Sequence, residues 1–408
     1  METTYKNKKS VSTGVSFKEI ALVQEQLEKT QKTYRKLSIG LPKDPDENEK
    51  RVMLSPQAVL ELTEKGHKVM GESGFGEKSS WSDTKYEASG IEIVSAQRVY
   101  EADLILKVSP FKTDEIKLLK NEQTIISALH QNTLTKANIE QLIKSRITAI
   151  ALELIKESNN FYPFVHSMSE IAGILAIMTG AEYLSSEAGK LKLLGGVTGV
   201  PPTEVIIIGA GTAGEAAART AIGLGASVQV FDHSIERLSE LKKNVSHGIY
   251  TSVPNRNVLE RKIQEADVLI GAGEDFDQET SYLITDYMVS KMKKGSVIVD
   301  LNTDTGSLIE TSRPTSFSAP TYIKYGVIHY CVPNIASKTS KTSSIALSNT
   351  VMPILNNICR NESFASVLQN NTSVRNGIYI YRGILTNKRI ANKFKIDFRD
   401  IDLISAVL

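Results

Sequence analysis

Apolar and polar positions along the chain repeat one pattern: short apolar runs alternate with segments in which apolar residues recur at helical spacing. Apolar runs separated by helices are typical of buried strands in a parallel sheet. One helix in the first half has clear ends, because Ser55 suits an N-cap, Pro56 suits the first helical position and Gly66 follows the last residue. The strands expected in this half are Leu37–Leu41, Lys68–Glu72, Ile91–Ser95, Ala102–Val108, Thr124–Leu129 and Ile147–Glu153.

The pattern is interrupted once and then resumes. A long amphipathic segment from Ser169 to about Lys190 leads to the glycine-rich stretch LLGGVTGVPP, after which strands and helices alternate again. The tail from about Thr342 is helical and then aromatic, and we expect it to pack on the first domain. We therefore predict two doubly wound parallel-sheet α/β domains, residues 1–164 with 342–408 and residues 165–341. The strands expected in the second half are Glu204–Ile208, Ser227–Phe231, Val268–Gly271, Ser296–Leu301 and Val327–Val332.

Length, charge and cysteine content narrow the class of protein. A chain of 408 residues is long enough for two domains, and its net charge of +2 gives no basis for binding nucleic acid or an anionic membrane. The two cysteines, Cys331 and Cys359, are too few for a disulfide framework and indicate a reducing compartment. No apolar run approaches the ~20 residues of a transmembrane helix, and the start METTYKNKKS does not resemble a signal peptide. We expect a cytoplasmic protein whose first residues are polar, with a capping box at Ser16 and Glu19 opening a helix.

A buried strand runs directly into a GxGxxG turn and a helix over Val205–Gly214 and the residues that follow. In such a turn Gly209 permits the tight bend, Gly211 lets a pyrophosphate approach the backbone, and Gly214 permits close packing of helix on strand. The helix start at Thr212 and Ala213 presents N–H groups to the phosphates. This arrangement predicts a dinucleotide site, although the alternative is a glycine-rich turn that serves packing alone.

Asp232 closes the next apolar strand, SVQVFD, and follows Gly214 by 18 residues. A carboxylate at about this distance binds the adenosine ribose hydroxyls and repels a 2′-phosphate, which favours NAD over NADP. Arg237 is either a contact on the adenosine side or a solvated helix residue. The second half of the chain is therefore predicted to be a Rossmann-like NAD-binding domain.

Four polar side chains lie where chemistry is expected in parallel α/β sheets, near the carboxyl ends of strands. Arg51 follows the first strand and suits a carboxylate, which its planar guanidinium binds through two hydrogen bonds. Lys107 is a candidate to polarise a carbonyl or to hold the carboxylate, and His130 is a candidate to transfer protons. Asp304 is a candidate to hold an ammonium group or to orient the acid–base residue, and Asp300 is the alternative carboxylate.

Each of these residues also has an ordinary structural interpretation, as a solvated charge or a structural histidine. We predict no metal site. The remaining histidines show no comparable arrangement and are given no role: His67, His166, His233, His247 and His329.

Several stretches carry a resemblance to a known family: EKRVMLSP, GHKVMGESGFGEKSSWSD, LILKVSP, MSEIAG, LLGGVTGVPPTEVIIIGAGTAG and HYCVPN. From about Leu37 to Leu408 the chain resembles the alanine dehydrogenases and the related nicotinamide nucleotide transhydrogenase alpha subunit. The resemblance implies two Rossmann-like domains separated by a cofactor cleft, a homo-oligomer that is often a hexamer, and NAD-dependent, reversible oxidation of L-alanine to pyruvate and ammonia.

The resemblance also implies roles for individual residues. Arg51 and Lys107 occupy the substrate-binding positions, His130 the acid–base histidine and Asp304 the catalytic aspartate. The NAD contacts that it implies are Ser169, Gly209, Gly211, Thr212, Ala213, Gly214, Asp232, Leu301, Val332 and Asn334, within the stretch Val332–Ile335.

Two departures from the family pattern leave alternatives open. Thr305-Gly306-Ser307 stands where family members carry Gln-Gly-Gly, and the loop Ala272–Asp277 is unusually acidic. The alternatives are a related dehydrogenase for another amino acid, a transhydrogenase-like protein and a non-catalytic NAD-binding protein. Lys107, His130 and the lack of a membrane segment favour the dehydrogenase over the transhydrogenase subunit.

Overall fold

The computed structural model describes residues 36–129, 134–245, 249–273, 282–304, 306–360 and 364–407. Several predictions therefore lie outside the described residues: the capping box at Ser16 and Glu19, the acid–base candidate His130, the acidic residues from Glu274 to Asp277, and Thr305.

The first domain is built on an eight-stranded sheet with the order β15-β14-β6-β5-β4-β1-β2-β3. The strands from β1 to β6 are parallel, whereas β14 runs antiparallel to β6 and β15 antiparallel to β14. Strand β1 lies between β2 and β4, so the chain reverses its direction of winding next to β1, where α/β sheets place their ligands. The strands are β1 (Ser38–Leu41), β2 (Lys68–Glu72), β3 (Glu92–Val94), β4 (Leu104–Leu106), β5 (Thr124–Ser127), β6 (Thr148–Ala151), β14 (Ile378–Tyr381) and β15 (Ile384–Leu385).

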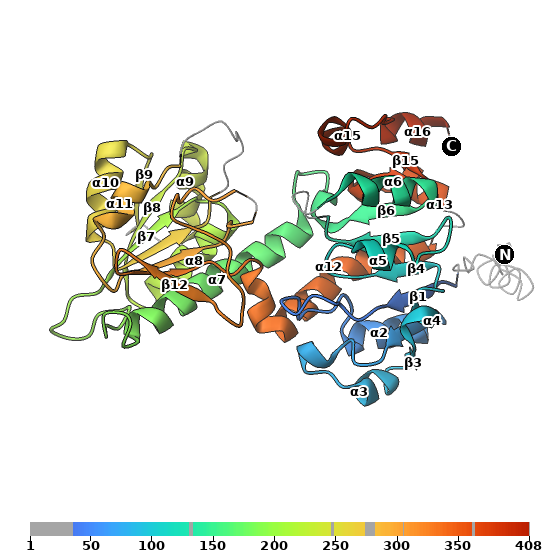
Figure 1. The fold of residues 1–408 in the computed structure, drawn as a ribbon, viewed down its shortest axis with the longest axis horizontal. Coiled ribbons are helices and arrows are strands. Elements are labelled where there is room, and N and C mark those ends of the chain that lie inside the picture. The colour runs from blue at the N-terminus through green and yellow to red at the C-terminus, as the bar shows by residue number, and fades with distance from the viewer. Residues whose placement is uncertain are drawn as a thin grey trace, which may run out of the picture.

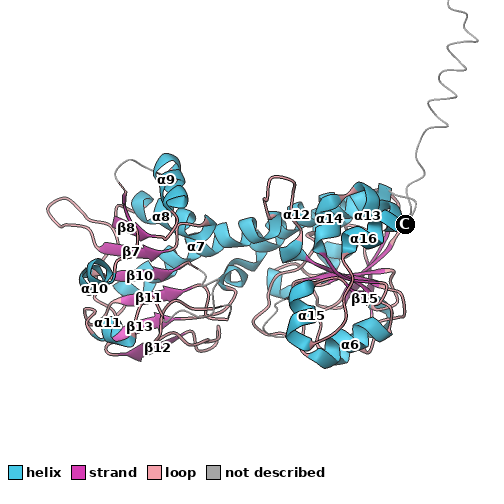
Figure 2. Cartoon of the chain, turned by 90° about the horizontal axis from the view of Figure 1, so that it is seen from above, coloured by secondary structure: helices cyan, strands magenta, loops and turns pink. Residues whose placement is uncertain are grey.

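Helices cover both faces of this sheet, as Figure 2 shows for α6 and α15 on one side and α13 and α14 on the other. Helix α2 begins as predicted, because the Ser55 side chain accepts the N–H of Ala58 and Pro56 is the first helical residue. The helices of this domain are α2 (Pro56–Glu64), η1 (Glu77–Ser79), α3 (Asp83–Glu87), α4 (Ala96–Val99), α5 (Thr113–Ile116), α6 (Lys136–Lys144), η2 (Leu152–Leu154), α13 (Phe364–Asn370), α14 (Thr372–Gly377), α15 (Lys388–Phe394) and α16 (Ile401–Val407).

The second domain has a seven-stranded sheet, β12-β13-β11-β10-β7-β8-β9, whose six parallel strands are arranged in the same order as the six parallel strands of the first sheet. All its strands are parallel except β12, which is antiparallel to β13 at the edge. Its strands are β7 (Glu204–Ile208), β8 (Ser227–Phe231), β9 (Tyr250–Ser252), β10 (Val268–Gly271), β11 (Val297–Asp300), β12 (Thr321–Lys324) and β13 (Val327–Tyr330). Its helices are α8 (Thr212–Gly223), α9 (Ile235–Asn244), α10 (Arg256–Glu265), α11 (Asp286–Ser290) and η3 (Ile335–Thr339).

Two long helices, α7 (Pro163–Ser185) and α12 (Ser340–Arg360), run between the two domains (Figures 1 and 2). Helix α7 belongs to both cores, because Met168 packs in the first hydrophobic cluster and Leu175 in the second. Within the described residues, α7 is the one helix long and apolar enough to cross a membrane by length and composition. It packs against α8, β10 and β11, and 33% of its apolar window is buried.

The predicted fold class, two doubly wound parallel-sheet domains, is confirmed. The interpretation of 169–190 as an amphipathic segment is wrong, since α7 starts at Pro163, ends at Ser185 and buries the consecutive residues Leu175, Ala176 and Ile177. Apolar residues lie on more than one side of α7, because Val165, Ile174 and Met178 are exposed while Leu175, Ala176 and Ile177 are buried. The tail does return to the first sheet, where β14 pairs with β6. The domain boundaries themselves stay a prediction, because α7 and α12 span the connection.

Candidate active site

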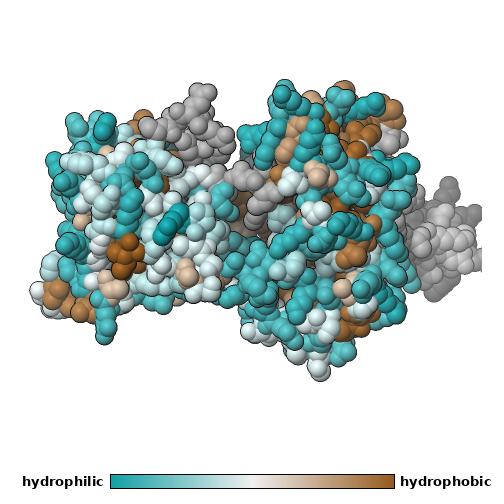
Figure 3. Space-filling model, in the orientation of Figure 1, coloured by the Kyte–Doolittle hydropathy of each residue, from teal (hydrophilic) through white to brown (hydrophobic). Residues whose placement is uncertain are grey.

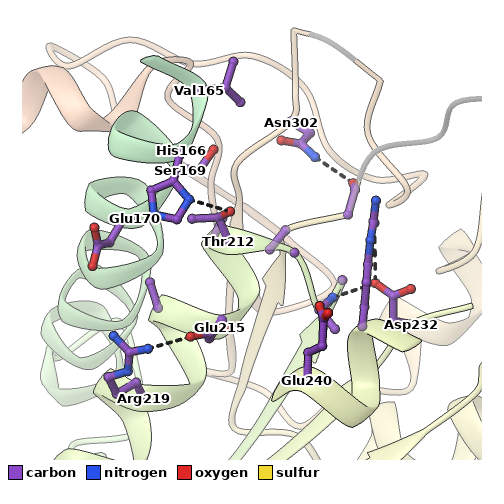
Figure 4. Close-up of a pocket in the computed structure, with 18 residues that line it drawn as sticks. Val165, His166, Ser169, Glu170, Thr212, Glu215, Arg219, Asp232, Glu240 and Asn302 are labelled. Atoms are coloured by element: carbon purple, nitrogen blue, oxygen red, sulfur yellow. Dashed lines mark hydrogen bonds and ion pairs between the residues drawn. The ribbon is translucent and has the colours of Figure 1, made fainter. Parts of the chain in front are cut away.

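A cavity of about 570 Å³ opens at the carboxyl ends of β7 and β8, beside the start of α7. It is formed by the glycine-rich turn after β7, by the first turns of α7, and by residues following β8, β10 and β11 (Figure 4). Six of the predicted cofactor residues line this one cavity: Ser169, Gly209, Gly211, Thr212, Ala213 and Asp232.

The three glycines of the turn have distinct structural roles. Gly209 has φ +105°, a conformation that L side chains rarely adopt, and a Cβ on Gly214 would lie 1.9 Å from the carbonyl oxygen of Gly209. A Cβ on Gly211, by contrast, would meet no atom within 4 Å. Packing of the protein therefore requires Gly209 and Gly214, but it does not explain Gly211. Open space over Gly211, at the start of α8, fits a phosphate bound close to the backbone.

Asp232 lies at the end of β8 with its carboxylate toward the turn. One carboxylate oxygen, Oδ2, accepts the N–H of Ala210 at 2.7 Å, and Oδ1 accepts the N–H of Ser234 at 2.7 Å. The guanidinium of Arg237 lies 4.0 Å from Oδ2 and is half exposed. Each carboxylate oxygen accepts one backbone N–H and has capacity for another hydrogen bond, so Asp232, which lines the cavity, can both hold the turn in shape and accept hydrogen bonds from a ribose diol.

His166 of α7 also lines the cavity, although the sequence suggested no role for it. Its Nδ1 lies 3.4 Å from the Thr212 hydroxyl, and its ring packs at 4.8 Å from that of Phe161 (Figure 4). His166, which was given no role from the sequence, is therefore a further candidate for contact with a cofactor. The only signal in the sequence was its place three residues before Ser169.

Arg51 is buried in the loop after β1, where Glu49 binds it. The N–H, Nε and NH2 groups of Arg51 donate to the Glu49 carboxylate at 2.9, 2.9 and 2.6 Å. The third nitrogen, NH1, donates to the thioether sulfur of Met168 at 3.1 Å. A thioether is a weak acceptor, so this edge of the guanidinium is the one available to a substrate carboxylate.

Lys107 is the second buried cation, at the end of β4. Its ammonium lies 2.6 Å from Glu115 Oε2, 3.8 Å from Asp44 Oδ1 and 3.2 Å from the carbonyl of Pro110. Burial raises the pKa of Asp44, and the charge of Glu49 adds to this, although Lys107 and a hydrogen bond from Ser109 oppose it. Both substrate-binding candidates are thus held by carboxylates that the sequence interpretation missed.

The two aspartates at the turn after β11, Asp300 and Asp304, have different surroundings. Asp300 is 2% exposed and accepts the N–H of Asn302 and the hydroxyl of Ser307. Burial raises its pKa despite these hydrogen bonds. Asp300 is therefore held within the turn, which argues against it as the functional carboxylate, whereas Asp304 is half-buried at its tip. Ser307 fixes the turn, and Gly306 has φ +139°, so part of the unusual Thr305-Gly306-Ser307 sequence serves local structure.

Four predicted NAD contacts do not line the described cavity: Gly214, which packs against Gly209, and Leu301, Val332 and Asn334. Leu301 packs against the second core, and Val332 is only 2% exposed. Asn334 has φ +57° and donates its side-chain N–H to Glu49 at 3.0 Å. The last three of these residues follow β11 and β13, and their contact with a cofactor stays a prediction. Beside the predicted acid–base position, Glu153 accepts the N–H of Leu129 at 2.6 Å.

Among the residues that the structure describes, no group of three or more histidine, cysteine or acidic side chains is placed to hold a metal ion. The described residues supply two buried cations, the carboxylates that bind them and a cavity at the glycine-rich turn.

Comparison with known proteins agrees with this geometry. A family model described as "Alanine dehydrogenase/PNT, N-terminal domain" matches residues 40–172, and "Alanine dehydrogenase/PNT, C-terminal domain" matches residues 176–388. The curated Alanine dehydrogenase 2 of Staphylococcus aureus is 35% identical over 372 residues, covering 90% of this chain and 99% of the relative. The chain belongs to the alanine dehydrogenase/PNT family.

One solved structure supports the same assignment to the alanine dehydrogenase/PNT family, and a second shares the fold. A structure of an L-alanine dehydrogenase has a TM-score of 0.82 at 34% identity and covers 88% of this chain and 99% of its own. A transhydrogenase from Sinorhizobium meliloti has a TM-score of 0.74 at 23% identity, covering 86% of this chain and 100% of its own. At that identity the second likeness shows a shared fold alone.

Proposed function

We propose that this protein is an NAD-dependent alanine dehydrogenase that oxidises L-alanine to pyruvate and ammonia and also catalyses the reverse reaction. One observation carries the proposal beyond family membership. Met168 contacts the open edge of Arg51, and the next residue, Ser169, lines the nucleotide cavity. A carboxylate bound to Arg51 would therefore lie beside a dinucleotide bound in the cavity.

The residues of the cavity fit NAD. The space over Gly211 and the N–H groups at the start of α8 suit a pyrophosphate, and Asp232 suits a ribose with two free hydroxyls. The same carboxylate disfavours a 2′-phosphate, which supports NAD rather than NADP. When bound, the nicotinamide supplies the hydride acceptor for the substrate Cα.

The remaining chemistry belongs to the side chains of the first domain and of the turn after β11. Arg51 binds the substrate carboxylate, and Lys107 polarises the carbonyl oxygen of the 2-oxo acid in the reverse direction. His130 transfers protons to and from the nitrogen and oxygen of the reacting carbon. Asp304 stabilises the charged nitrogen as ammonia leaves.

Replacement of His130 tests this division of roles. His130→Ala should lower turnover about 10²- to 10⁴-fold, the range for loss of a general acid–base group, and should leave NADH affinity unchanged. Turnover is followed by NADH absorbance and affinity by NADH fluorescence. A variant that keeps wild-type turnover would exclude His130 as the acid–base residue.

We further propose a cytoplasmic homo-oligomer. The loop between α7 and β7 projects from the second domain (Figure 1) and carries four exposed apolar residues: Leu191, Leu193, Val197 and Val200. Figure 3 shows apolar side chains gathered at this tip, at the lower left. Exposed apolar clusters of this kind support association with a second copy of the chain. Analytical ultracentrifugation would test it, and a monomer at micromolar concentration would contradict it.

A further inference from the structure

The buried carboxylate of Glu49 contacts both domains. It belongs to the loop after β1, and its side chain is 4% exposed. Besides its hydrogen bonds with Arg51, it accepts the side-chain N–H of Asn334 at 3.0 Å and the hydroxyl of Ser337 at 3.3 Å. Asn334 follows β13 of the second domain, and Ser337 belongs to η3, in which Ile335 packs in the second core and Ala336 in the first. One carboxylate therefore joins the substrate arginine to the domain that holds the nucleotide cavity.

On the side of the first domain, Glu49 sets the position of Arg51. Its carboxylate accepts hydrogen bonds from the Nε and NH2 groups of Arg51, which leaves the NH1 group for a substrate carboxylate. Because the two side chains share parallel hydrogen bonds, rotation of the guanidinium toward a ligand would also move the Glu49 carboxylate.

On the side of the second domain, the contact is equally well defined. Asn334 is the residue that precedes η3, and its backbone adopts the left-handed conformation, with φ +57°. The Ser337 hydroxyl also accepts the N–H of Lys50 at 2.8 Å, and the Lys50 ammonium lies 4.7 Å from the centre of the Phe317 ring. Two adjacent residues of the loop, Glu49 and Lys50, therefore contact the segments that follow β11 and β13.

The carboxylate of Glu49 is ionised in this environment. Burial alone would raise its pKa, but the charge and hydrogen bonds of Arg51, together with Asn334, outweigh burial and lower the pKa. A buried charge whose partners move apart loses stabilisation that water cannot replace. Movement of Arg51 or of Asn334 therefore affects the other through Glu49.

We propose that Glu49 is a positioning residue that couples the two ligand sites, so that nucleotide binding in the second domain raises the affinity of Arg51 for the substrate carboxylate. The inference rests on the proposed function. Coupling of two sites is reciprocal, so a 2-oxo acid must raise the affinity for nucleotide by the same factor.

The experiment measures the dissociation constant of NADH by fluorescence, with and without saturating pyruvate, in the absence of ammonia so that no turnover occurs. In the wild type, pyruvate should tighten NADH binding by about fivefold or more. In Glu49→Gln the ratio of the NADH dissociation constants measured without and with pyruvate should fall toward one. Asn334→Gly keeps the left-handed backbone and the Glu49–Arg51 pair, and it should lower the factor as well. Because Glu49 and Asn334 act through one contact, the double variant should lose no more than the larger single loss.

Glu47→Gln is the matched control, since Glu47 lies in the same loop but its side chain is 90% exposed, and it should keep the wild-type factor. A wild-type factor in Glu49→Gln or Asn334→Gly, or additive losses in the double variant, would overturn the coupling. Equal NADH binding with and without pyruvate in the wild type would overturn it too and leave the proposed function intact. Absence of NADH binding in the wild type would instead overturn the proposed function.

Discussion

The ammonium of Lys107 and the carboxylate of Glu115 form a buried ion pair, with Nζ 2.6 Å from Oε2 and 2.7 Å from Oε1. The side chain of Lys107 is 1% exposed and that of Glu115 is 12% exposed. A substrate that reaches Lys107 must therefore share the ammonium with a carboxylate already bound to it. Part of the positive charge expected from the sequence is neutralised within the site.

Removing this carboxylate should destabilise the protein. Glu115→Ala leaves the Lys107 charge with only the more distant Asp44, and we expect a loss of about 3 kcal/mol in the free energy of unfolding. Urea denaturation followed by circular dichroism measures it. Glu61→Ala is the control, because its pair with Lys65 is about half exposed and should contribute less than about 1 kcal/mol. Similar losses in the two variants would contradict a buried pair at Lys107.

The open space over Gly211 predicts a selective loss of nucleotide binding. Gly211→Ala adds a methyl group that meets no protein atom within 4 Å, so the melting temperature should stay close to wild type. The methyl group would occupy the place of the pyrophosphate, and NADH affinity should fall about tenfold or more. Gly223→Ala, also without a neighbour within 4 Å, should change neither property. Unchanged NADH affinity in Gly211→Ala would place the phosphates elsewhere.

Asp232 should determine the choice between NAD and NADP. Asp232→Ser removes the negative charge beside Arg237 while keeping a hydrogen-bonding side chain, so the preference for NAD should fall at least about tenfold. The ratio of kcat/KM for the two cofactors measures it. Glu236→Gln, an exposed change on the next helix, serves as the control. A preference that survives in Asp232→Ser would mean that another group rejects the 2′-phosphate.

His329 should make the second domain sensitive to acid. Burial lowers its pKa to about 4, although its hydrogen bond with the Val327 carbonyl acts in the opposite direction. Nδ1 donates to that carbonyl at 3.0 Å, so Nε2 accepts the Thr311 hydroxyl at 2.8 Å and the ring is neutral. The unfolded chain takes up the proton first as pH falls below about 6.5, which should remove on the order of 2 kcal/mol of stability by pH 4.5.

The comparison is between the pH dependence of stability in the wild type and in His329→Gln, which carries no titrating group. The variant should lose less stability than the wild type between pH 6.5 and 4.5, whatever its absolute stability. His233→Gln, at an exposed histidine, should retain the wild-type pH dependence. An unchanged pH dependence in His329→Gln would show that other groups cause the acid sensitivity.

The fold was largely predictable because buried parallel strands are short apolar runs. The bounds of β2, β7, β8 and β10 agree with the prediction residue for residue. The missed strands lie at or next to sheet edges. Strand β9 is the polar sequence Tyr-Thr-Ser. Strand β12 forms an antiparallel hairpin with β13, which follows it after two residues, whereas β14 pairs with the distant β6, which no local pattern reveals.

The site was only partly predictable. The glycine-rich turn and the aspartate after β8 could be predicted, because local backbone geometry fixes their spacing in the sequence. The partners of the two cations do not follow a local rule. Glu49 lies two residues before Arg51 in a loop, and Glu115 lies eight residues after Lys107 in the short helix α5. Their burial depends on how α7, η3 and the loops pack, which composition does not record.

The proposed function requires that this protein oxidises L-alanine with NAD. The most direct measurement is the absorbance of NADH with purified protein, first with NAD⁺ and L-alanine and then with NADH, pyruvate and ammonia. We predict turnover in both directions, abolished or strongly reduced by His130→Ala. A protein that binds NADH but turns over neither L-alanine nor pyruvate with ammonia would contradict the claim.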